Sequence, residues 1–137
     1  MNRTSRMKSK KKTGYSIKYI DSLWSKAVRT RDRGKCRLCM SPAVDAHHIV
    51  HRSKNWALRW DMSNGISLCR EHHNEADKLY MVQTILSLID SEYLIERQKK
   101  YKFKADYLTA LQMSEKEFKA EKVEELKEII KNSWAGK

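Results

Sequence analysis

The segment VDAHHIVHRSKNWALRWDMSNGISLCREHH (Val44–His73) decides how the rest of the chain is organised. It contains every histidine of the 137-residue protein, and two cysteines stand just upstream of it. The histidines are His47, His48, His51, His72 and His73. Imidazole and thiolate are ligands that transition metals select. Their concentration in one segment predicts a metal site, and the flanking sequence is interpreted by how it serves that site.

The chain is strongly basic, and most of the excess charge lies near its N-terminus. The net charge is +12, and residues 1–40 hold 13 Lys and Arg against two Asp. Such a localised cationic segment indicates DNA as a partner, because Lys and Arg neutralise phosphates and release counterions. Residues 1–15 are predicted to be a disordered basic arm that contacts DNA. The contacting residues would include Lys10, Lys11 and Lys12.

The predicted location is the cytoplasm, a reducing intracellular compartment. Residues 1–12 are not followed by the apolar run of a signal peptide, and no stretch reaches the ~18 apolar residues that span a bilayer. No membrane partner is therefore expected. In such a compartment a Cys-x-x-Cys pair is more often a metal knuckle or a redox pair than a disulfide.

Two residue pairs with the same two-residue gap predict a structural Zn²⁺ site. Cys36 and Cys39 form the first pair, and Cys69 and His72 form the second. Four thiolate and imidazole donors at this spacing suit a tetrahedral zinc ion. The alternative is a reduced cysteine pair packed as small hydrophobic side chains, with His72 incidental. A thioredoxin-like role would need a βαβ context, which the sequence lacks.

The sequence around these pairs predicts helix, strand, loop, strand and helix. Apolar residues from Ile17 to Val28 recur at helical spacing, and this helix should end near Gly34. Val44–Val50 is a candidate strand. Asn64-Gly65 is a hairpin-type turn signal before a second short strand. A later amphipathic helix is predicted from the 3-4-3-4 spacing of Leu79, Val82, Leu86, Ile89 and Tyr93.

The motifs Cys-x-x-Cys, His-His-Ile and Asn-Gly-Ile-x-Leu-Cys-x-x-His-His resemble the HNH endonuclease family. The resemblance covers about Leu23 to Asp77, and the Arg52–Asp61 stretch is similar to small phage recombination nucleases. It implies an α+β fold with a ββα-metal core, a zinc knuckle and flanking helices at both ends. Residues 16–80 would form this core with its lead-in helix, and residues 81–137 a helical C-terminal extension.

The resemblance also implies the roles of the catalytic residues. His48 would be the general base, and Asn64 would fix the loop and the base. Phosphodiester hydrolysis needs such groups, because the attacking water must lose a proton and the developing negative charge must meet a cation. An imidazole with an ordinary pKa of about 6.5 is largely neutral at pH 7 and can accept that proton.

The same resemblance implies that His47 and His73 hold a catalytic divalent ion, which would be Mg²⁺, Mn²⁺ or Ni²⁺. On a regular strand, however, His47 and His48 face opposite sides. Both can join one site only where the strand ends or twists. Asp45 or His51 could therefore replace His47 as a ligand, and the sequence leaves these alternatives open.

The adjacent histidines of the last motif can serve two different metals. His72 stands where many family members have a fourth cysteine, which makes the implied zinc set Cys3His. On a helix, His72 and His73 point about 100° apart. One side chain can thus face the zinc while its neighbour faces the catalytic ion.

Several other side chains in the segment have both a functional and an ordinary interpretation. Arg52, Arg59 and Arg70 could bind phosphate oxygens with their forked donors, or they could be surface charges. Trp56 and Trp60 could stack on bases, but aromatic residues near Leu58 are more often part of a core.

The C-terminal part predicts a final helix. Ser114 is a candidate N-cap, with Glu117 at the third following position. This region is much more acidic than the N-terminus, so we do not expect it to lie along DNA. It could pack back on the domain or form a homodimer interface.

The sequence therefore predicts an HNH endonuclease that hydrolyses DNA. Two other classes remain: a non-catalytic zinc module that binds nucleic acid, and a structural or assembly protein that works through its C-terminal helices. The binding module would hold zinc and DNA without cleavage that depends on His48. The assembly protein would form oligomers and bind DNA weakly.

Overall fold

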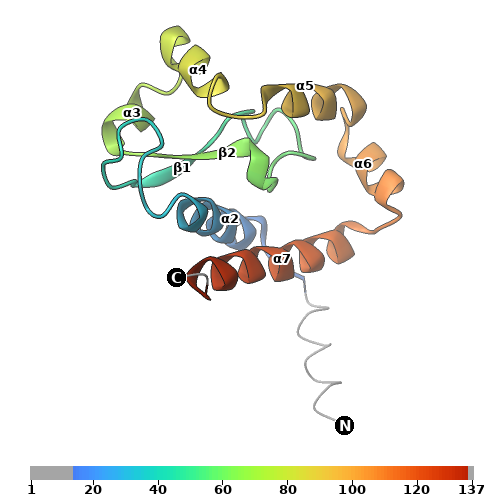
Figure 1. Cartoon of the computed structure of the whole chain (residues 1–137). Helices are drawn as coiled ribbons and strands as arrows, with labels where there is room; N and C mark the ends of the chain where they lie inside the picture. The colour runs from blue at the N-terminus through green and yellow to red at the C-terminus, as the bar shows by residue number, and fades with distance from the viewer. Residues whose placement is uncertain (1–13, 136–137) are drawn as a thin grey trace.

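The computed structural model describes residues 14–135 of the chain, which combine six α-helices with one small antiparallel sheet (Figure 1). This agrees with the predicted α+β class. The elements are α2 (Ile17–Arg31), β1 (Asp45–His48), the 3-10 helix η1 (Met62–Asn64), β2 (Gly65–Leu68), α3 (Arg70–Asn74), α4 (Leu79–Leu86), α5 (Ser91–Lys100), α6 (Lys104–Leu111) and α7 (Glu115–Ala135). The predicted DNA contacts Lys10, Lys11 and Lys12 lie outside the described residues. None of the described helices has both the length and the apolar character needed to cross a membrane.

Helix α2 lies between the sheet and α7 (Figure 1). The Ser16 side chain caps it by accepting a hydrogen bond from the Tyr19 amide at 3.0 Å. The helix ends at Arg31, before the predicted end, because Arg33 and Gly34 adopt positive φ angles of 60° and 71°. Its fully buried residues are Ile20, Trp24, Ala27 and Val28. The predicted apolar stripe is therefore the face that α2 buries.

The two strands pair antiparallel, with His48 opposite Gly65. The first strand is shorter than predicted, and residues 49–64 connect it to the second. The prediction that Asn64-Gly65 forms a hairpin turn was wrong, because Gly65 is an extended residue inside β2 with a φ of −128°. Glycine is needed there for space, since a Cβ atom would come within 2.6 Å of both Trp24 and Val28 on α2.

The predicted amphipathic helix over Leu79–Tyr93 was also wrong. Helix α4 ends at Leu86, and α5 starts after Asp90, whose side chain caps it by accepting from the Tyr93 amide at 3.0 Å. Helix α4 buries Met81 and Ile85, whereas Leu79 is 73% exposed. The buried face is selected by contact with the cluster of Cys36, Ile66, Leu68 and Cys69, which periodicity alone does not specify.

Helix α7 packs back on α2, one of the two arrangements expected for the C-terminal part. Its predicted cap is confirmed, because the Ser114 amide donates to Glu117 and the Glu117 amide donates to the Ser114 hydroxyl. Phe118, Val123 and Leu126 are buried in the same core cluster as the apolar face of α2. This packing uses the main apolar face of α7, and a homodimer through these helices stays a prediction.

Replacing Gly65 by alanine is expected to lower the free energy of unfolding by about 1–3 kcal/mol, because the new methyl group must displace Trp24 or Val28. Urea unfolding measures this loss, and the near-UV circular dichroism of the native protein should change with it. Gly34→Ala is the comparison, since nothing lies within 4 Å of its added Cβ and only its φ of +71° opposes it. Native-like near-UV spectra for both variants would contradict the packing argument.

Candidate metal centre and histidine-lined cavity

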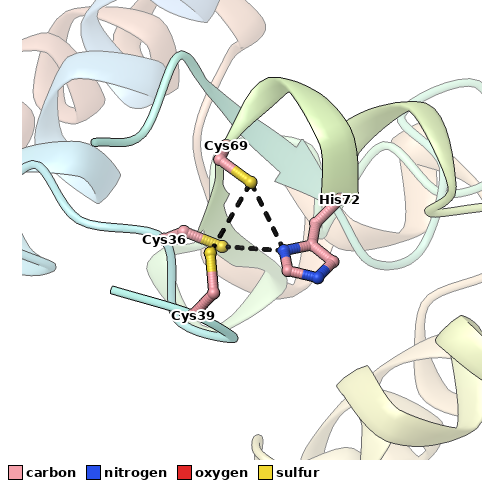
Figure 2. Close-up of side chains that lie close together, drawn as sticks. All are labelled: Cys36, Cys39, Cys69 and His72. Carbon is pink, nitrogen blue, oxygen red and sulfur yellow. Dashed lines mark hydrogen bonds between the residues drawn. The ribbon is translucent and has the colours of Figure 1, made fainter. Parts of the chain in front are cut away.

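Four side chains from two separate parts of the chain converge on one point (Figure 2). Cys36 and Cys39 come from the connection between α2 and β1, while Cys69 occupies the N-cap position of α3 and His72 lies on α3. The Nδ1 atom of His72 lies 3.4 Å from the Cys36 sulfur and 3.3 Å from the Cys69 sulfur. The sulfurs of Cys39 and Cys69 are 3.7 Å apart.

These distances fit a tetrahedral zinc ion. With zinc–sulfur bonds of about 2.3 Å and zinc–nitrogen bonds of about 2.0 Å, two sulfurs should be about 3.8 Å apart, and a sulfur and a nitrogen about 3.5 Å. All four candidate ligand atoms lie within 4.8 Å of one another. The predicted Cys3His group can therefore hold a metal ion such as zinc.

The pKa values of the four side chains are shifted in different directions. Hydrogen bonds from Ser41 lower the pKa of the Cys39 thiol to about 6, so this side chain is largely a thiolate at pH 7. Hydrogen bonding to the Cys36 sulfur is the largest cause of a raised pKa at His72. A metal ion bound here would take the place of the proton that His72 shares with the Cys36 sulfur, because it needs a neutral imidazole and thiolates as ligands.

A cavity of about 970 Å³ contains several of the other predicted site residues. His47, His48 and His73 all line it, as does Asp45. The strand ends at His48, which allows neighbouring histidines to reach one cavity despite their alternation. The rings of His47 and His73 meet edge to face with centroids 6.1 Å apart, and Asp45 Oδ2 lies 3.9 Å from His73 Nε2.

The imidazole of His48 is held in one orientation and one tautomer. Its ring stacks on Trp24, with centroids 3.8 Å apart and an angle of 11° between the planes. Its Nε2 atom lies 2.8 Å from the carbonyl oxygen of Arg59. A carbonyl oxygen only accepts hydrogen bonds, so Nε2 carries the proton and Nδ1 is a free acceptor. Burial lowers the pKa of His48 to about 4, and the ring is neutral at pH 7.

Asn64 holds the connection between the strands in place. Its side chain is fully buried and accepts a hydrogen bond from the Val50 amide at 2.7 Å. It also donates to the carbonyl oxygens of Val50 at 3.0 Å and Leu58 at 3.1 Å. Asn64 therefore ties both sides of segment 49–64 together, which a residue required only for a turn would not do.

Asp21, which sequence reasoning missed, anchors the same segment to α2. Its carboxylate accepts from Arg59 Nε at 3.0 Å and Nη2 at 2.8 Å, and from the Trp60 indole at 2.8 Å. Arg52 adds an ion pair at 3.2 Å. The only signal in the sequence was that Asp21 precedes Trp24 by three residues, which puts both on one helix face.

The remaining predicted residues have varied surroundings. The guanidinium of Arg59 is engaged by Asp21, whereas that of Arg52 is 53% exposed at the cavity. Arg70 is exposed and does not line the cavity. Trp60 is buried and Trp56 packs beside it, which confirms the core interpretation of both tryptophans. The fifth histidine, His51, is exposed and bonds to Ser53 at the cavity wall.

Comparison of the chain with protein-family models, with curated proteins and with solved structures gave no match.

The Cys3His group should bind one zinc ion per chain, and His72→Ala should weaken zinc binding at least about tenfold because it removes a direct ligand. Metal analysis of the purified protein and competition with a chromogenic chelator measure both quantities. His73→Ala is the matched control, because it removes the adjacent histidine, which lies outside this group. Equal zinc loss in the two variants would contradict the assigned ligand set.

Asp21→Asn is expected to lower stability by about 1–3 kcal/mol at neutral pH, because the Arg59 guanidinium loses its charged acceptor. Burial raises the pKa of Asp21, but the hydrogen bonds from Arg59 and Trp60 outweigh it and hold the pKa below 3.8. Such a group stabilises the fold above the unfolded pKa and loses this effect as pH falls through the folded pKa. The difference from the unchanged protein should therefore shrink below about pH 4.

Urea unfolding at several pH values tests this, and zinc release at acid pH affects both proteins alike. Asp77→Asn is the control, because Asp77 is an exposed acid at the same cavity. A loss of stability at Asp21→Asn that is the same at every pH would show that its charge is not what anchors segment 49–64.

Proposed function

We propose that the protein is a metal-dependent endonuclease of the HNH type, which hydrolyses phosphodiester bonds in DNA. One observation carries the proposal: a neutral imidazole, His48, whose Nδ1 is left as an acceptor, lines a cavity together with two further histidines. Those two, His47 and His73, come from β1 and α3. A general base beside candidate metal ligands is the arrangement that phosphodiester hydrolysis requires.

The role of the general base follows from its hydrogen bond. A water molecule that attacks phosphorus transfers a proton to Nδ1 of His48. The imidazole becomes a cation at that moment, and the Arg59 carbonyl oxygen stabilises the remaining N–H bond. Asn64 and Asp21 hold the segment that supplies this carbonyl. Pre-fixed groups of this kind need no reorganisation during the reaction.

His47, His73 and Asp45 are the side chains that would hold the catalytic ion. Their donors are spread more widely than the Cys3His ligands, which alone among residues 14–135 bring three or more donors within 4.8 Å. An ion that keeps several water ligands, as Mg²⁺ does, fits such an open set. When bound, a divalent ion would stabilise the negative charge that develops on the phosphate.

DNA fits the charge of the molecule. The chain carries a net charge of +12, and Arg52 and Lys18 line the cavity with exposed side chains. A polyanion would be attracted to such a surface and held beside the proposed base. The basic arm would add contacts that carry no sequence information.

Cleavage of supercoiled plasmid tests the proposal. Zinc-loaded protein without other metals is given Mg²⁺, Mn²⁺, Ni²⁺ or no ion, next to the variants His48→Ala, His47→Ala and His51→Ala. We expect metal-dependent cleavage that falls at least about 100-fold in His48→Ala, the lower end of a general base's usual contribution. His51→Ala is the matched control from the same cavity wall and should keep most of the activity.

The same variants show whether His47 or His51 holds the ion. They also distinguish a nuclease from a non-catalytic zinc module. Loss of activity in His51→Ala but not in His47→Ala would assign the ligand to His51 instead. If zinc-loaded protein binds plasmid but no ion supports cleavage, the non-catalytic zinc module is the better account, since the Cys3His group does not depend on the cavity.

A further inference from the structure

A basic and aromatic segment joins α5 to α6. It lies well after the cysteine and histidine motifs in the sequence. Residues 97–104 read Arg-Gln-Lys-Lys-Tyr-Lys-Phe-Lys, with five basic side chains and no acidic one. Phe103 is 69% exposed, although the chain contains only two phenylalanines. Lys99, Lys100 and Lys102 are exposed, and none of the ion pairs found among residues 14–135 involves them.

The stability of the fold does not explain an exposed phenylalanine at position 103. Phe103 occupies the N-cap of α6 without making a side-chain cap, where Ser, Thr, Asp or Asn would stabilise the helix. Lys99 and Lys100 suit the last turn of α5, and Lys104 has an ion pair with Glu115 at 3.0 Å, so Phe103 is the residue that departs from the local rule. An exposed residue that breaks a local rule, as Phe103 does, is typical of a functional surface.

The segment is attached to the same connection that carries the cavity residues. The Asn55 side chain is buried and donates to the Tyr101 carbonyl oxygen at 3.1 Å. The Lys104 ammonium lies 5.6 Å from the centre of the Trp56 ring. Both contacts join residues 101–104 to segment 49–64. A ligand on this surface would therefore be held in a fixed relation to His48.

We propose that residues 99–104 bind unpaired nucleotides of a DNA strand. Phe103 stacks on a base, while Lys99, Lys100 and Lys102 contact phosphates on either side of it. An exposed ring has a face for any base, and the lysines neutralise the backbone, which is how single strands are bound without sequence preference. This inference rests on the proposed nuclease function and narrows its substrate to DNA with a single-stranded or splayed segment.

Fluorescence anisotropy tests the proposal with full-length, zinc-loaded protein and no added divalent ion. The probes are a labelled oligothymidylate and a blunt duplex of the same length. Phe103→Ala should raise the single-strand Kd about fivefold or more, since stacking on one base is worth at least about 1 kcal/mol. The duplex Kd should change less than about twofold, because paired bases offer no free face.

Two further variants serve as controls for the Phe103→Ala measurement. Phe103→Trp should keep the affinity, because it retains an aromatic face. Leu111→Ala should bind as the unchanged protein does, since it removes an exposed apolar side chain from the other end of α6. Equal losses for the single strand and the duplex in Phe103→Ala, or no loss at all, would overturn the proposal.

The lysines are tested through the salt dependence of single-strand binding. Combined Lys99→Ala, Lys100→Ala and Lys102→Ala should reduce the slope of log K against log salt by up to about 2, at about 0.7 per lost phosphate contact. Removing three exposed lysines of α7 is the charge-matched control and should leave the slope unchanged. These are Lys116, Lys127 and Lys131. An equal change of slope in both triple variants would show general charge attraction and overturn the assigned contacts.

Binding and cleavage can fail separately. If the unchanged protein cuts no DNA but Phe103→Ala still loses single-strand affinity, the binding site stands and the nuclease function falls. If the protein cuts plasmid and Phe103→Ala binds and cuts as before, the nuclease function stands and this site falls.

Discussion

The indole of Trp24 is the part on which the remaining structure depends. It is buried against both strands, because its ring stacks on His48 and leaves no room for a side chain at Gly65. A buried indole must also satisfy its N–H group, and here it donates to the Asp61 carbonyl oxygen at 3.0 Å. One rigid side chain of α2 thus fixes the position of β1, of β2 and of the end of the connection between them.

The connection between the strands needs a second kind of support. Segment 49–64 has little regular backbone pairing, so side chains satisfy its buried carbonyl and amide groups instead. The buried side chains of Asn64 and Asn55 form hydrogen bonds with the backbone of this segment. Asp21, on α2, accepts hydrogen bonds from Arg59 of the segment. Removing one member of such a network leaves others unsatisfied in a low-dielectric interior. The groups that stabilise this segment are therefore also the groups that orient His48.

The sequence predicted correctly those features that depend only on residues close together in the chain. The cap of α7 needs only Ser114 and Glu117, and the spacing of the Cys3His ligands is set by two short motifs. The role of Gly65 could not be predicted in this way, because the atoms that exclude a side chain come from a helix far away in sequence. The buried face of α4 and the partners of Asp21 depend on tertiary contacts in the same manner. The sequence predicted which histidines line the cavity. It did not predict the groups that orient His48.

Helix α3 makes the cavity dependent on the Cys3His group. It spans only Arg70–Asn74, and a helix of this length has too few internal hydrogen bonds to hold its own orientation. The Cys3His group attaches it through Cys69 and His72, and the next residue, His73, faces the cavity beside Asp45. A metal ion at the Cys3His group would therefore fix the direction of His73 as well as the fold. For that reason the zinc ligands and the proposed catalytic ligands can be adjacent in sequence and still act on different ions.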